Sequence, residues 1–208
     1  MTRPRIRFVT MTGIDERTDL DRVQSLSRRF AVEWAVLMSP DLQGEHPRFP
    51  GQSVIDALRS LPVRKAVHLC GAHAKAVMAG GDPGVDLAGF DRVQINHRRP
   101  VAELVAAFAT AHGVQGIMQS RTLEFPDAPG VQTLFDKSGG HGRLPVEWPV
   151  HPGHLVGLAG GISPDTIDGV LDTLDMDGEV WLDMETGVRT DDWLDLDKVE
   201  EILAKVAG

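Results

Sequence analysis

The chain has 208 residues, 42% of them hydrophobic and 25% charged, and a formal net charge of −9. The length fits one domain over residues 1–208 with a sizeable core, and the negative charge argues against general binding to nucleic acids or anionic membranes. The single cysteine, Cys70, excludes an intramolecular disulfide. Because no signal peptide and no membrane-spanning apolar stretch stands out, we expect a cytoplasmic protein.

Eight short, largely apolar runs predict β-strands, at residues 6–11, 33–38, 65–70, 91–96, 115–119, 132–136, 155–159 and 179–184. Six stretches have a helical pattern: 18–29, 52–60, 72–79, 100–112, 164–174 and 195–206. Ser163 and Pro164 form an N-cap and first-residue pattern for the fifth helix. The connections 120–131 and 139–154 are rich in Pro and Gly and are expected to lack helices.

Strands that alternate with helices predict a parallel sheet, and eight such repeats predict a single closed (β/α)8 barrel. An open doubly wound sheet is the rival fold. It is disfavoured because the first strand is not followed by a Gly-rich dinucleotide-binding turn.

Polar residues recur on one alternating phase of the predicted strands, where a barrel directs side chains into its lumen. Such buried groups cost on the order of 1–3 kcal/mol each when they are unpaired, so they indicate either a shared pocket at the C-terminal mouth or internal hydrogen bonds. They are Thr10, Thr12, Glu33, His68, Cys70, Gln94, Asn96, Gln119, Asp136, Asp183 and Glu185.

Glycine turns follow the last two strands, at Gly160-Gly161 and at Glu185-Thr186-Gly187. Glycine lets backbone N–H groups approach an anion closely, and barrels often hold phosphate on the loops after strands seven and eight. The two turns therefore predict a phosphate cup, although they could also be ordinary strand-to-helix turns.

Three segments carry a resemblance to a known family: GLAGGISPDTI (157–167), DMETGVR (183–189) and LFDKSGGHGRLPVEWP (134–149). Weaker matches are VTMTGID (9–15), SPDLQGEHPRFP (39–50) and VQIN (93–96). Together they resemble phosphoribosylanthranilate isomerase, a barrel enzyme of tryptophan biosynthesis that converts an aminoaldose to an aminoketose.

The resemblance implies a role for each matching residue. It implies that Asp136 is the general acid, that Arg48 contacts the substrate carboxylate, and that Asp183 is the aspartate of the strand-eight motif. The residues implied or expected to bind other parts of the substrate are Asn96, Gly139, Gly140, Gly160, Gly161, Glu185, Thr186, Gly187 and Arg189.

The chain departs from the family's pattern at two places. Thr12 stands where the family has a cysteine base, and a threonine hydroxyl is too weak a base without activation. The base is therefore open among Glu33, His68 and Cys70. Glu185 and Arg189 replace a serine and a glutamate of the family. Either Arg189 offsets the charge of Glu185 beside the cup, or Glu185 binds a hydroxyl or an amine and the ligand is not a simple ribose phosphate.

The function favoured by these patterns is an isomerase or related lyase that acts on a small phosphorylated sugar derivative by acid–base chemistry. It would need no organic cofactor and would work as a monomer or homodimer. One alternative is a phosphate-independent barrel enzyme that uses Glu33, His68, Asp183 and Glu185, with or without a metal. Another is a non-catalytic ligand-binding barrel. The stretch HLCGAH (68–73) is not a known closed zinc pattern, so we favour a polar pocket without a metal.

Overall fold

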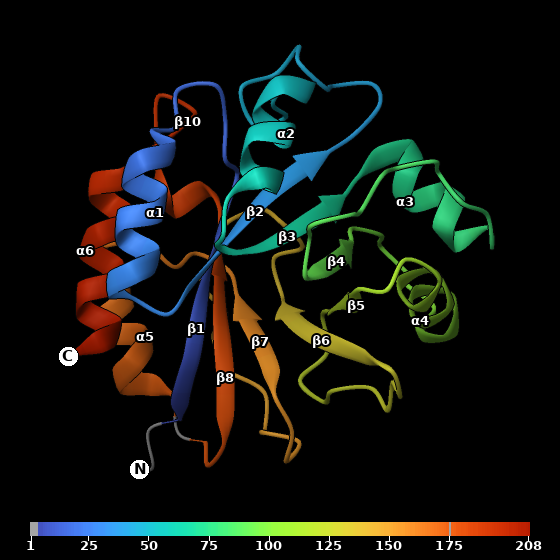
Figure 1. The fold of residues 1–208 in the computed structure, drawn as a ribbon. Coiled ribbons are helices and arrows are strands. Elements are labelled where there is room, and N and C mark those ends of the chain that lie inside the picture. The colour runs from blue at the N-terminus through green and yellow to red at the C-terminus, as the bar shows by residue number, and fades with distance from the viewer. Residues whose placement is uncertain (1–3, 175) are drawn as a thin grey trace.

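The computed structural model describes residues 4–174 and 176–208, and its centre is a closed barrel of eight parallel strands in sequence order (Figure 1). Pairing of β1 with β8 closes the barrel. The predicted (β/α)8 barrel is therefore confirmed. The strands are β1 (Arg5–Thr12), β2 (Val32–Met38), β3 (Arg64–Leu69), β4 (Arg92–Ile95), β5 (Gln115–Ser120), β6 (Val131–Asp136), β7 (Val156–Ala159) and β8 (Glu179–Met184).

Helices surround the barrel except beside β6, where Figure 1 shows only loops. As expected from their Pro and Gly content, the connections from β5 to β6 and from β6 to β7 contain no helix. No helix in the described part of the chain is long and apolar enough to cross a membrane. The helices are α1 (Leu20–Arg29), α2 (Gln52–Ser60), α3 (Gly71–Met78), α4 (Ala102–Ala111), α5 (Ile167–Thr173) and α6 (Leu196–Ala207).

The start of α5 differs from the prediction. The helix begins at Ile167 and not at Pro164, so Ser163 is not its N-cap. The Ser163 carbonyl instead accepts hydrogen bonds from the N–H groups of Thr166 and Ile167, and the Thr166 hydroxyl accepts one from the Ser163 N–H. The prediction was wrong because Thr166 closes a separate turn ahead of the helix.

A short hairpin between β8 and α6 was not predicted. A 3₁₀ turn, η1 (Thr186–Val188), leads into β9 (Arg189–Thr190) and the antiparallel β10 (Trp193–Leu194). The tight connection places Asp191 and Asp192 at positive φ, 50° and 67°. The hairpin brings the Asp192 side chain back toward the mouth of the barrel.

The polar lumen residues fall into two layers, and the layer around Glu33 is a closed ion-pair network. Glu33 is fully buried, and it accepts hydrogen bonds from Arg92 and Arg64, in each case with 2.8 Å between Nε and Oε2, and one from Thr10. A second contact joins Arg92 Nη2 to Glu33 Oε1. Glu33, Arg64 and Arg92 lie at the N-terminal ends of β2, β3 and β4, below the mouth, and Thr10 lies beside Glu33 on β1. For Thr10 and Glu33, therefore, internal hydrogen bonding explains the polar pattern.

Candidate functional site

A cavity opens at the C-terminal ends of the strands and contains about 530 Å³ of free space, including the part open to solvent. Strand ends supply part of its wall: Thr12, His68, Gln94, Asn96, Gln119, Asp136 and Asp183. Loops supply the rest, including Gly140, Gly142, Gly160, Gly161, Glu185, Thr186 and Gly187. The structure thus brings together most of the polar residues predicted at the mouth, and Glu33 and Cys70 are not part of the wall.

Asp183, near the end of β8, is a titratable group whose pKa this environment alters. It is 9% exposed, and its Oδ1 accepts a hydrogen bond of 2.7 Å from the Thr12 hydroxyl. Burial raises the pKa of Asp183 to about 7; the Thr12 hydrogen bond opposes the rise, while the charges of Glu185 and Asp136 add to it. Its Oδ2 accepts no hydrogen bond from the described part of the chain. Asp183 can therefore exchange a proton near neutral pH.

Asp136, the last residue of β6, is held by its own loop. Its Oδ1 accepts hydrogen bonds from the Ser138 hydroxyl at 2.8 Å and the Gly139 N–H at 3.0 Å, and its Oδ2 accepts one from the Gly140 N–H at 2.6 Å. Both glycines have positive φ, which lets the loop turn back over the carboxylate. The carboxylate is 4% exposed and has a fixed orientation in the cavity wall.

The other predicted bases differ in their suitability. His68 is 2% exposed, and burial lowers its pKa to about 4, so the imidazole is neutral at neutral pH. Burial raises the pKa of the Cys70 thiol to about 11, although Asn96 donates a hydrogen bond to its sulfur. Glu33 has its carboxylate oxygens paired with arginines in the lower layer: burial alone would raise its pKa, but Arg92 and Arg64 hold it below the usual range. The placement of Cys70 and Glu33 therefore argues against a base role.

The two predicted phosphate turns touch each other and are covered by the loop after β6. The N–H groups of Gly160 and Gly161 donate to no acceptor within the described residues. A Cβ at Gly160 would lie 2.8 Å from the Arg143 carbonyl oxygen, and one at Gly187 would overlap the Ile162 carbonyl oxygen. These glycines are therefore needed for loop packing, whether or not the turns bind phosphate.

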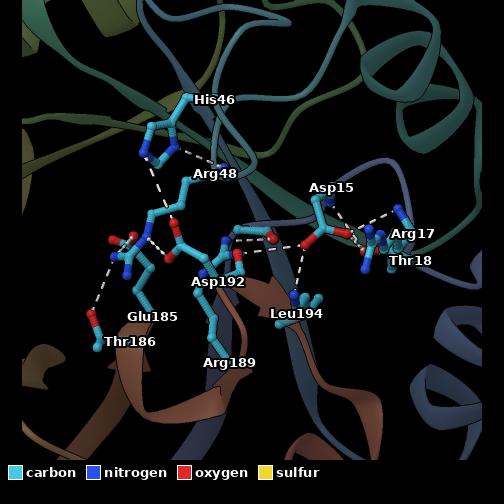
Figure 2. A network of polar contacts seen from close by, with 11 residues as sticks. Asp15, Arg17, Thr18, His46, Arg48, Glu185, Thr186, Arg189, Asp192 and Leu194 are labelled. Carbon is cyan, nitrogen blue, oxygen red and sulfur yellow. Dashed lines mark hydrogen bonds and ion pairs between the residues drawn. The ribbon is translucent and has the colours of Figure 1, made fainter.

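Arg48, in the loop between β2 and α2, is bound to the segment after β8, as Figure 2 shows. Its Nε donates to Asp192 Oδ1 at 2.7 Å, and its Nη1 donates to Glu185 Oε1 at 2.8 Å and to the Thr186 hydroxyl at 3.3 Å. The guanidinium is therefore matched by two carboxylates of the protein itself.

Arg189 interacts with the charge of Glu185 but forms its hydrogen bonds with other residues. It is 6% exposed and donates to the Gly13 carbonyl at 2.8 Å and the Asp192 carbonyl at 2.7 Å, with Asp15 Oδ2 at 3.4 Å (Figure 2). The β9–β10 hairpin turns its side chain toward the loop after β1. The direct ion-pair partner of Glu185 is Arg48, and Arg189 affects Glu185 only at longer range.

The carboxylates of the cavity wall have no lysine or arginine beside them in the wall of the described structure. These carboxylates are Asp136, Asp183 and Glu185. No group of three or more His, Cys, Asp or Glu side chains in the described residues is arranged to hold a metal ion. The wall is therefore suited to proton transfer and to ligands with hydrogen-bond donors.

Solved structures similar to this chain are phosphoribosylanthranilate isomerases. The enzyme from Thermus thermophilus matches with a TM-score of 0.64 and 20% identity, over 97% of this chain and 98% of that chain. The Pyrococcus furiosus enzyme matches with a TM-score of 0.63 and 13% identity, over 96% and 98%. A third is a complex with reduced 1-(o-carboxyphenylamino)-1-deoxyribulose 5-phosphate, at a TM-score of 0.64 and 14% identity, over 98% and 99%.

No family model and no curated protein matches the sequence. Identities this low show a shared fold, which the chain has over nearly its whole length. The resemblance noted from the sequence is therefore confirmed for the fold.

Proposed function

We propose that the chain is an aldose–ketose isomerase of the Amadori type, acting on a small phosphorylated aminosugar derivative at the mouth of the barrel. The observation that carries this proposal is the convergence of two buried carboxylates, Asp136 and Asp183, on one cavity in a barrel shared with phosphoribosylanthranilate isomerases. Two such groups supply the acid and the base that the reaction needs.

The reaction moves protons and leaves the substrate's composition unchanged. An acid protonates the ring oxygen of the aminoaldose, and the C1–O bond breaks as the nitrogen lone pair forms a C=N bond. A base then removes the proton from C2, which gives an enolamine. A proton returned to C1 and loss of the hydroxyl proton at C2 produce the aminoketose. These steps need no redox cofactor.

We assign the base to Asp183 and the acid to Asp136. A carboxylate whose pKa is about 7 is partly ionised at neutral pH and is a stronger base than an ordinary carboxylate. The Thr12 hydroxyl, which stands where the resembling family has a cysteine, donates to Asp183 and would orient it. Thr12 is thus a positioning residue, and Asp183 replaces the missing base.

The substrate phosphate is assigned to Gly160, Gly161, Thr186 and Gly187. The N–H groups of the first glycine pair, which have no acceptor among the described residues, support this assignment, as does the 5-phosphate on the molecule bound in one of the similar structures. We further propose a cytoplasmic monomer or homodimer that acts on a small molecule and binds neither nucleic acid nor membrane. The net charge of −9 and the lone cysteine support that description.

A second candidate is a phosphate-independent barrel enzyme, which is favoured by the absence of lysine and arginine from the described cavity wall. Thermal unfolding with and without ribose 5-phosphate separates the two. Stabilisation of the wild type, lost in Gly161→Ala, is expected for the phosphate cup because a ligand that binds only the folded state raises its stability. No stabilisation at millimolar ligand would favour the second candidate.

Turnover tests the isomerase itself. The glycosylamines that ribose 5-phosphate forms with benzylamine and with anthranilate serve as substrates, and ¹³C NMR detects the ketose carbon of the product. We expect the wild type to convert at least one substrate. Asp21→Asn, which changes an exposed residue of α1 away from the cavity, is the control and should convert it too. Asp183→Asn and Asp136→Asn should be inactive. No product from either substrate would refute the proposed activity.

A further inference from the structure

Arg48, the guanidinium that bonds to the cavity wall, is not free to pair with an acidic substrate group because two carboxylates of the protein already hold it. Within the described residues, Arg48 is the one guanidinium that bonds to side chains of the cavity wall, through Glu185 and Thr186. Its Nε is also bound to Asp192. An incoming carboxylate would have to displace one of these carboxylates and then sit beside it, and like charges at such distances repel.

One carboxylate oxygen of the same wall accepts no hydrogen bond from the described residues. It is Oδ2 of Asp183, which lines the cavity and is nine-tenths buried, and Glu185 lies on the same wall. Such an oxygen can accept a hydrogen bond from an amine, and the negative wall favours a nitrogen that becomes positive, as in the iminium formed on ring opening or in a protonated product amine. The amine nitrogen of an aminosugar is such a group.

We infer that the mouth selects an aminosugar phosphate whose nitrogen is basic and whose nitrogen substituent carries no carboxylate, with Glu185 as the specificity-determining residue. This inference rests on the proposed function and narrows its substrate class. Glu185 has two effects on the cavity. It offsets the positive charge of Arg48, and it adds negative charge to the wall near Asp183. The substrate of this chain thus differs from the o-carboxyphenyl compound bound in one of the similar structures.

Two stable amines that differ by one carboxylate test the inference: N-benzyl- and N-(2-carboxybenzyl)-1-amino-1-deoxyribitol 5-phosphate. Isothermal titration calorimetry of the wild type should give a Kd for the benzyl compound that is roughly tenfold or more below that of the carboxybenzyl compound. Glu185→Gln should shrink this ratio to about threefold or less, since it frees Arg48 for the carboxylate.

Glu179→Gln is the matched control, because Glu179 lies at the other end of β8, where it pairs with Arg5 and Arg7. The same charge change there should leave the ratio as in the wild type. Arg48→Gln is the second variant. It removes the counter-charge of Glu185 and should widen the preference for the benzyl compound, so the inference stays testable if Glu185→Gln does not fold.

The outcomes separate this inference from the proposed function. Equal affinities for the two phosphorylated amines, or tighter binding of the carboxybenzyl compound, would overturn the selectivity and leave the isomerase proposal standing. If unphosphorylated N-benzyl-1-amino-1-deoxyribitol binds as tightly as its phosphate, the phosphate assignment fails while the carboxylate contrast still supports the selectivity. No binding of any of the three amines would overturn both.

Discussion

Replacing Asp183 by Asn should make the protein more stable at alkaline pH and should have little effect on its stability under acidic conditions. The wild-type carboxyl has a pKa near 7 in the folded state, against 3.8 as its ordinary value. Between these values the folded chain binds more protons at this site than the unfolded chain does. Stability therefore falls as pH rises through this window, and the full penalty is present above about pH 7.

The size of the effect follows from the same difference. A pKa that is about three higher in the folded state corresponds to roughly 4 kcal/mol, which is the upper limit for what Asn can recover. The amide keeps an oxygen that can accept the hydrogen bond from Thr12, so the change removes the charge and little else.

Urea unfolding of the wild type and of Asp183→Asn at pH 5 and pH 8 measures this effect. We expect the variant's advantage in the free energy of unfolding to be larger at pH 8. Asp21→Asn, at an exposed position, controls for the general loss of one negative charge and should show no such trend. A difference between wild type and variant that is the same at both pH values would refute the reasoning.

Three further changes test other parts of the structure. Asp15→Ala removes the carboxylate from buried Arg189 and should cost roughly 3 kcal/mol in urea unfolding; unchanged stability would show that the pair is unimportant. Glu33→Gln should cost a similar amount, roughly 3 kcal/mol, but keep isomerase turnover because the residue lies below the mouth; a folded, inactive variant would return Glu33 to the candidates for the base. Gly161→Ala puts a methyl group at φ +67° against the backbone of Leu144, so we expect weaker binding of ribose 5-phosphate by calorimetry, and unaltered affinity would count against the cup.

The barrel could be predicted because its signals are local. Each strand is a short apolar run, each helix has its own periodicity, and Pro and Gly mark the two connections without helices. The start of α5 was misplaced because both Ser163 and Thr166 satisfy the preferences of an N-cap, and the hydrogen bonds between them close a turn ahead of the helix.

The mouth was predictable only in part. The alternation of side chains along the strands identified Asp136 and Asp183 as lumen residues. It does not show how far below the mouth a lumen residue lies, so Glu33 in the lower layer looked equivalent to them. The partners of Arg48 and Arg189 depend on the β9–β10 hairpin, which is only two residues per strand. Contacts between residues that are more than a hundred positions apart have no local signature.

The raised pKa of Asp183 has no local signature either. It arises from burial, together with the charges of Glu185, which directly follows β8, and of Asp136 at the end of β6. The sequence therefore marks Asp183 as a site residue, and the packing around it gives the residue its proposed function.

The pH dependence of isomerase turnover tests the central claim that Asp183 is the base. With a subsaturating aminosugar phosphate substrate, kcat/KM of the wild type should rise with pH and level off above an apparent pKa near 7. Asp183→Asn should lose this rise together with nearly all of the turnover, while Thr12→Val should stay active with a shifted inflection. Full activity of Asp183→Asn with an unchanged pH profile would contradict the account.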